Sequence, residues 1–149
     1  RQMCIRDRGK WNPALDDPTI TDASQVERVL LCSGKIRWDL VKAREKQGLE
    51  GKVAIVSLER LYPLPDEDLA PILERYAHVS DIRYVQDEPE NQGAWPFMTL
   101  HLTQALSKHL SRDISLTPIT RPWASAPSVG SAKRHQEEEA DLMQRALEA

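Results

Sequence analysis

Residues 28–34 read RVLLCSG, and residues 53–58 read VAIVSL. Each contains a short, continuous apolar run of strand length, and such runs are typical of strands that are buried on both faces of a sheet. Between them, residues 35–46 place apolar side chains on one side of a helix and Lys42, Arg44 and other charged side chains on the other. This unit predicts two parallel strands, because the helix returns the chain to the edge from which it started.

The same alternation of strand and helix patterns continues to the end of the chain. The remaining predicted elements are a helix from its N-cap Asp66 through Tyr76, a strand over residues 82–85, a helix marked by Met98 to His109, a weaker strand over residues 114–120, and a last helix over residues 131–149. Four strands that alternate with four helices predict an α/β fold, Rossmann-like, in which helices cover both faces of a mainly parallel sheet.

The first 27 residues show no periodic pattern and contain two prolines with several turn formers. We therefore predict an irregular arm over residues 1–27 and an α/β domain over residues 28–149. Asp22 or Ser24 is expected to cap a short turn in the arm. The opening RQMCIRDR differs in composition from the rest, and we expect residues 1–8 to be non-native or truncated sequence. Because the chain begins with arginine, we also expect it to be a fragment of a longer protein.

The composition sets limits on function. With 149 residues and 17.0 kDa, the chain has the size of one ordinary domain. A net charge of −3 and an aromatic content of 5% argue against a nucleic-acid-binding protein, which would carry surplus positive charge and stacking side chains. The sequence has no apolar run of about 18 residues and no signal peptide, and two cysteines are too few for a disulfide framework. We therefore expect a cytoplasmic domain without nucleic-acid or membrane partners.

Ligands and partners of such a sheet meet the loops that follow the carboxyl ends of its strands. The candidate loops are residues 33–35, 59–65, 86–95 and 121–131. In the first loop, the backbone after Ser33 could hold an anion at the start of the helix, with Lys35 adding positive charge. The chain contains neither GxxxxGK(S/T) nor GxGxxG, so a plain strand-to-helix turn is the simpler interpretation. In the second loop, Glu59 and Arg60 could pair with each other or face a partner.

Residues 86–95, QDEPENQGAW, form the most polar stretch of the chain. Its carboxylates could perform acid–base chemistry only if a pocket separated their pKa values, and no nucleophile or oriented base stands nearby. We favour a docking loop over a plain polar loop, because tryptophan is common at the centres of interfaces. The predicted docking residues are Gln86, Asp87, Glu88, Asn91, Gln92 and Trp95.

The fourth loop, residues 121–131, leads into the last helix through several serines, which favours simple helix capping over an anion site. The four histidines show no metal-ligand spacing, so we predict neither a metal site nor a catalytic residue in this chain. Cys32 lies inside an apolar strand and is expected to be buried and inert. The run of Glu137, Glu138 and Glu139 is expected to form a solvated helix face.

Four segments together resemble one family. They are RVLLCSGK at residues 28–35, VAIVSLERLYPLP at 53–65, VQDEPENQGAWPF at 85–97 and RPWASAPSVGSAKRH at 121–135. In this order they resemble the C-terminal domain of the thiamine-diphosphate-dependent first component of the 2-oxoglutarate dehydrogenase complex, and DEPENQGAWP is most similar to the actinobacterial forms. The resemblance implies a transketolase C-terminal-like fold, which agrees with the alternation of strands and helices.

The resemblance also implies what a longer parent protein would do. The parent enzyme would decarboxylate 2-oxoglutarate in the tricarboxylic acid cycle with thiamine diphosphate and magnesium. As a homodimer it would pass the succinyl group to a lipoyl-bearing succinyltransferase. The family's GDG and NN motifs for the cofactor are absent from this chain. We therefore expect no cofactor here, and a structural, dimerising and regulatory role beside the remaining domains.

For the actinobacterial forms, the resemblance implies an acetyl-CoA effector near this domain. The candidate effector-binding residues here are Arg60, Ser33 and Lys35. Residues 66–68 are acidic where those forms have arginines, and acidic groups repel a polyphosphate. Two rival hypotheses stay open: a free-standing α/β module that binds a nucleotide or acetyl-CoA, and a pure assembly domain that is half of an obligate dimer.

Overall fold

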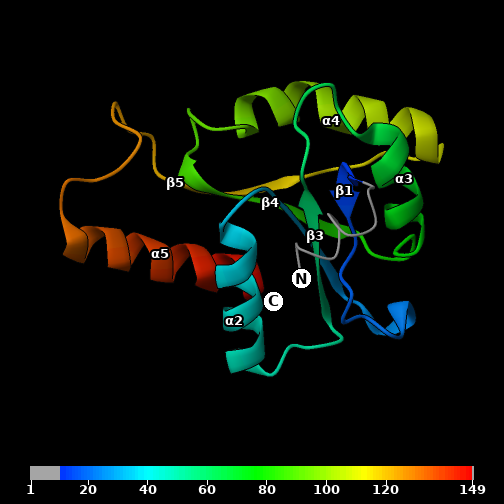
Figure 1. The fold of residues 1–149 in the computed structure, drawn as a ribbon, viewed down its shortest axis with the longest axis horizontal. Coiled ribbons are helices and arrows are strands. Elements are labelled where there is room, and N and C mark those ends of the chain that lie inside the picture. Colours follow the sequence, from blue (N-terminus) through cyan, green and yellow to red (C-terminus); the bar gives the residue numbers. More distant parts are fainter. Residues whose placement is uncertain (1–10, 149) are drawn as a thin grey trace.

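The computed structural model describes residues 11–148, and Figure 1 shows their arrangement. The elements are β1 (Ala14–Leu15), the 3-10 helix η1 (Ala23–Gln25), β2 (Arg28–Cys32), α2 (Ile36–Gln47), β3 (Val53–Leu58), α3 (Asp66–Glu74), β4 (Asp81–Pro89), α4 (Trp95–Leu110), β5 (Thr117–Arg121) and α5 (Ala132–Leu147). The strands form a sheet in the order β1-β3-β2-β4-β5, in which β1 alone among the described strands runs antiparallel to its neighbour. The predicted α/β fold with a mainly parallel sheet is confirmed.

The two faces of the sheet carry separate apolar cores, because side chains alternate along a strand. In β2, Val29 and Leu31 belong to the core under α3 and α4, whereas Leu30 and Cys32 belong to the core under α2 and α5. All four side chains are fully buried. In Figure 1, α4 crosses the top of the view, and α2 and α5 lie below the sheet. Burial of each such side chain contributes about 1.5–3 kcal/mol, which explains the continuous apolar runs of the central strands.

Strand β4 is longer than the sequence predicts. The pattern indicates a strand over residues 82–85, but β4 extends to Pro89. The ladder to β5 shifts register after Val85, so that Pro89 lies opposite Arg121. The prediction of a loop directly after residue 85 is therefore wrong. Polarity indicates solvent, whereas Gln86 is buried and Asp87 binds Arg121 of β5.

Helix α3 begins differently from the prediction. Pro65 occupies the N-cap position and Asp66 is the first helical residue, so the predicted N-cap at Asp66 is wrong. The Leu69 N–H donates to the Pro65 carbonyl oxygen at 2.8 Å, which starts the helix one residue early. The helix ends at Glu74, and Tyr76 is buried just beyond it.

The amino-terminal arm contributes to the fold from Ala14 onward. β1 pairs with the carboxyl end of β3, and Ile20 is buried in the core under α3 and α4. Asp22 caps η1 by accepting a hydrogen bond from the Ser24 N–H at 3.0 Å, as predicted. A strand forms in an irregular sequence here because pairing with β3 satisfies its backbone groups. The expectation for residues 1–8 lies outside the described residues.

Arg44 is a clear departure from the predicted charged face of α2. Its side chain is 1% exposed and forms an ion pair with Asp17, which is 3% exposed. Arg44 also donates to the Val53 carbonyl oxygen at 2.7 Å and to Thr19 Oγ1 at 3.0 Å. Helical periodicity cannot reveal this contact, because the acidic partner comes from the arm.

Candidate functional site

The polar loops of the chain gather at the carboxyl ends of the parallel strands, which we call the carboxyl edge. From β2 the chain crosses to β3 on one side, and it later returns to β4 on the other side of β2. Connections that leave the sheet in opposite directions open a crevice at this switch point. A cavity of about 240 Å³ lies there, with Ser33, Gln86 and Glu88 among its lining residues. The carboxyl edge is therefore the candidate functional site.

Gln86 organises the loop between β4 and α4. Its side chain is buried, and its Nε2 donates to the carbonyl oxygens of Pro89 and Gln92, each at 2.9 Å. Its Oε1 accepts from the Trp95 N–H at 2.8 Å. The Trp95 ring is also buried, with its centroid 5.9 Å from that of Tyr84. Gln86 and Trp95 thus hold the loop through buried contacts, and they do not form its solvent-exposed surface.

Gly93 is required by this arrangement. Its φ is +64°, in the left-handed region that favours glycine. A Cβ added here would lie 3.0 Å from Gln86 Oε1 and 3.1 Å from Glu88 Oε2. The loop therefore depends on glycine for both its backbone conformation and its close approach to β4.

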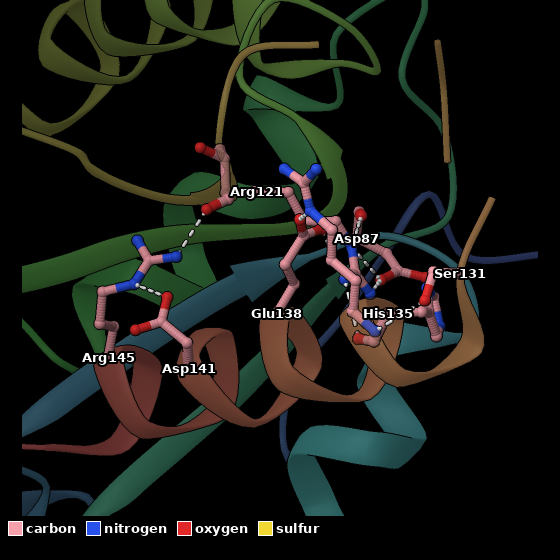
Figure 2. Close-up of polar contacts among 9 residues, drawn as sticks. Asp87, Arg121, Ser131, His135, Glu138, Asp141 and Arg145 are labelled. Atoms are coloured by element: carbon pink, nitrogen blue, oxygen red, sulfur yellow. Dashed lines mark hydrogen bonds and ion pairs between the residues drawn. The ribbon is translucent and has the colours of Figure 1, made fainter. Parts of the chain in front are cut away.

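Arg121, at the end of β5, joins three elements (Figure 2). Its Nε donates to the Asp87 carbonyl oxygen at 2.7 Å, and its Nη2 donates to Asp87 Oδ1 at 2.6 Å. Its Nη1 donates to the His135 carbonyl oxygen at 3.2 Å and to Glu138 Oε2 at 3.3 Å. The Arg121 side chain is 5% exposed. Charge-assisted hydrogen bonds from one buried guanidinium therefore hold β4, β5 and α5 together.

The loops that follow β4 and β5 are bound to each other. Asn91 Nδ2 donates to the Ala124 carbonyl oxygen at 3.0 Å, and the Ala124 N–H donates to Asn91 Oδ1 at 3.1 Å. Gln92 Nε2 donates to the same carbonyl oxygen at 2.8 Å. Beside this contact, Trp123 is 73% exposed. The two loops therefore form one surface with an aromatic side chain projecting from it.

The predicted docking residues fall into two groups. Asp87, Glu88 and Asn91 are exposed, Gln92 is half-buried, and the other two are the buried Gln86 and Trp95 described above. The docking role itself stays a prediction. Sequence reasoning missed Arg121 as the centre of a network and Trp123 as the exposed aromatic residue. The quoted RPW segment contained both, but nothing in its spacing indicates which of the two is buried.

The candidate effector-binding residues lie at the same edge, but both cations have partners. Lys35 Nζ lies 2.7 Å from Asp39 Oδ2, and this hydrogen bond raises the pKa of Lys35. Arg60 Nε donates to the Pro63 carbonyl oxygen at 2.9 Å, and its Nη2 lies 3.5 Å from Asp68 Oδ2. An anionic effector would compete with these carboxylates, and effector binding stays a prediction.

Three predictions near the edge can be compared with the structure. Ser131 caps α5 by accepting from the Arg134 N–H at 3.4 Å, as predicted. Cys32 is fully buried as predicted, and burial raises the pKa of its thiol to about 12. The prediction of a solvated face is wrong for Glu138, whose side chain is 14% exposed and binds Arg121. Its partner lies on another element, beyond the reach of a pattern within α5.

Two searches of residues 11–148 concern metals and membranes. No group of three or more His, Cys, Asp or Glu side chains there is arranged to hold a metal ion. No helix in the same range is long and apolar enough to cross a membrane.

The fold and the edge first define a class: a doubly wound α/β domain whose carboxyl-edge loops are locked together by hydrogen bonds. Within that class, the chain belongs to the 2-oxoglutarate dehydrogenase C-terminal family, whose model matches residues 5–147. The resemblance in sequence motifs is thereby confirmed.

Curated relatives cover nearly the whole chain. The 2-oxoglutarate dehydrogenase E1 component of Azotobacter vinelandii is 37% identical over 139 residues, which are 93% of this chain and 14% of that protein. The E1/E2 component of Corynebacterium glutamicum is 36% identical over 140 residues, or 94% of this chain and 11% of the relative. The multifunctional 2-oxoglutarate metabolism enzyme of Mycobacterium sp. strain JLS is 40% identical over 142 residues, which are 93% of this chain and 11% of that protein. The chain thus spans only a small part of these relatives.

Proposed function

We propose that this chain is the C-terminal domain of a cytoplasmic 2-oxoglutarate dehydrogenase E1 component, and that its carboxyl edge packs against the domains that hold the cofactor. In this proposal the parent enzyme is a homodimer that decarboxylates 2-oxoglutarate with thiamine diphosphate and magnesium. It passes the succinyl group to a lipoyl-bearing succinyltransferase. The chain itself carries out no catalytic step; it contributes a surface to the assembled enzyme.

The observation that carries the packing role is the fixed surface formed by the loops after β4 and β5. Asn91 and Gln92 hold Ala124, and the exposed Trp123 stands two residues after the buried Arg121. An aromatic side chain on a fixed base loses little conformational entropy when a partner covers it. Tryptophan is also enriched among the residues that dominate binding energy. This surface therefore favours a partner that covers it.

A chimera tests the proposal directly. In the E1 component of Azotobacter vinelandii, this chain would replace the matching C-terminal segment. We expect the chimera to form the same oligomer as the parent and to decarboxylate 2-oxoglutarate, whereas a deletion of the segment does neither. Trp123→Ala in the chimera is expected to weaken assembly, measured by sedimentation. Leu100→Ala is the control, because Leu100 is an exposed apolar residue within α4 and outside the four candidate loops.

Two results would overturn the proposal. Turnover of 2-oxoglutarate by the purified chain, with thiamine diphosphate and magnesium added, contradicts a non-catalytic domain. Loss of assembly on Leu100→Ala but not on Trp123→Ala contradicts packing through the carboxyl edge.

A further inference from the structure

The cavity at the switch point has a wall that is rich in hydrogen-bond acceptors. Its lining includes Ser33 from the end of β2, and Tyr84, Gln86 and Glu88 from β4. No lysine, arginine or histidine is among the described residues that line it. The Glu88 carboxylate forms no ion pair with any described residue, and Glu88 is exposed at the mouth of the cavity. The negative charge of the wall is therefore not neutralised within residues 11–148.

Tyr84 contributes a phenol group to the lining of the cavity. The residue is 1% exposed, and its hydroxyl forms no hydrogen bond with any described residue. Burial raises the pKa of Tyr84, and Cys32 and Glu88 raise it further. The phenol thus stays neutral and retains a lone pair for a donor. The Tyr84 hydroxyl can therefore accept a hydrogen bond from a donor that enters the cavity.

Gly93 allows acceptor oxygens to converge at one point. The position that a Cβ would take at Gly93 lies 3.0 Å from Gln86 Oε1 and 3.1 Å from Glu88 Oε2. Because both oxygens lie close to this one position beside Gly93, they lie close to each other, and one group that enters the cavity can approach both. Two acceptors from β4 close to one point suit a donor that carries several N–H groups.

We propose that this cavity binds the guanidinium or ammonium group of an arginine or lysine side chain, presented by another part of the longer protein. The inference rests on the proposed packing of the carboxyl edge and identifies the chemistry of one contact within it. The cation would donate to Glu88 and Tyr84, and it would neutralise the Glu88 carboxylate, which has no ion-pair partner within residues 11–148. Hydrogen bonds of this charged kind are about twice as strong as neutral ones.

Two other ligand classes fit the cavity less well. An anion would meet the Glu88 carboxylate with no cation in the described wall to offset the repulsion. A hard divalent cation would find one carboxylate, where Ca²⁺ takes six to eight oxygen ligands. A nitrogen cation with several N–H donors can bind the acceptor oxygens of the wall and neutralise the Glu88 carboxylate with one group.

The test uses the chain as it is and a pair of probes that differ in charge. N-acetyl-L-arginine amide and its neutral analogue N-acetyl-L-citrulline amide would be titrated in turn, with the backbone amide signals of Ser33, Gly93 and Ala94 followed by NMR. We expect saturable shifts with the arginine probe at millimolar concentration, and binding about tenfold weaker with citrulline. N-acetyl-L-lysine amide then shows whether an ammonium group is accepted.

Variants locate the contact. Glu88→Gln is expected to weaken binding of the arginine probe about tenfold. Glu90→Gln is the control and should leave the affinity unchanged, because Glu90 is not among the cavity-lining residues. Equal binding of arginine and citrulline, an unaffected Glu88→Gln variant, or no binding of either cationic probe would each overturn the proposal.

If the arginine probe binds but the chimera fails to assemble, the proposed function fails, whereas the inference that the cavity of this chain binds a cationic side chain still holds. If the chimera assembles and Glu88→Gln changes nothing, only the cavity inference fails.

Discussion

Two arginine-centred networks hold the chain together, and they differ in how much of each faces solvent. In the arm network, Arg44, Asp17 and Thr19 lie between the arm and α2, and both charged side chains are at most 3% exposed. In the edge network, Arg121, Asp87 and Glu138 lie at the carboxyl edge, where Arg121 is 5% exposed but Asp87 is 48% exposed.

The difference in exposure indicates a structural role for the arm network and a role at the protein surface for the edge network. Asp17 also accepts from the Ile55 N–H at 2.9 Å and from the Thr19 N–H at 3.0 Å, so its carboxylate is fully committed inside the fold. Asp87 keeps half of its side chain in solvent, although it holds Arg121. A buried pair fixes the position of one segment, whereas a pair with an open side can also meet a partner. The following predictions test that contrast.

The largest effect is expected from Arg44→Met. The substitution keeps most of the side-chain volume but leaves the Asp17 carboxylate buried without its cation. Breaking such a pair costs about 3–5 kcal/mol of the free energy of unfolding. Urea unfolding followed by circular dichroism measures this loss. Lys46→Met, on the exposed side of the same helix, serves as control and should stay within about 0.5 kcal/mol of the original chain. A loss for Arg44→Met no greater than that would contradict a structural arm network.

The same substitution at Arg121 is expected to cost less. Arg121→Met removes donors to Asp87, His135 and Glu138, but water can reach the Asp87 carboxylate and replace part of the loss. We expect a decrease of about 1–3 kcal/mol in the free energy of unfolding. If Arg121→Met proves as costly as Arg44→Met under the same urea conditions, the two networks do not differ in the way their exposure indicates.

What could be predicted from the sequence follows the same division. Strands β2 and β3 were predictable because burial on both faces demands continuous apolar residues, which a local pattern displays. The arm network was not, because Asp17 sits in a proline-containing segment and Arg44 sits among charged residues on α2. Each looks solvated until the chain brings the two together. At the carboxyl edge the sequence indicated the polar loops, but not that Gln86 is buried and Asp87 exposed.

Gly93→Ala tests how tightly the edge is built. Gly48 is the matched control: its φ is +65°, close to that of Gly93, but a Cβ there meets no atom within 4 Å. Both substitutions incur the left-handed backbone cost of about 1–2 kcal/mol. At Gly93 the added methyl group also meets Gln86 and Glu88, and we expect about 1 kcal/mol more from this overpacking. Equal unfolding free energies for the two alanine variants would show that the loop adjusts to the added methyl group. The carboxyl edge would then be less rigid than the proposed packing role of Trp123 requires.

The smallest effect is expected from a change of pH, which tests how much the charge of Asp17 contributes to the arm network. Burial tends to raise the pKa of Asp17, but hydrogen bonds from Thr19, Ile55 and Arg44 outweigh burial and hold it below the usual value of 3.8. Because this folded-state pKa lies below the unfolded value, the carboxylate contributes stability above the unfolded value, and the contribution is lost as the pH falls through the folded-state pKa. Asp17→Asn removes that titration. The difference in unfolding free energy between the original chain and Asp17→Asn should therefore be constant near neutral pH and shrink as the solution is acidified below about pH 4. A difference that stays constant down to strongly acidic pH would mean that the Asp17 charge contributes nothing, and the arm network would then stabilise the fold by shape and neutral hydrogen bonds alone.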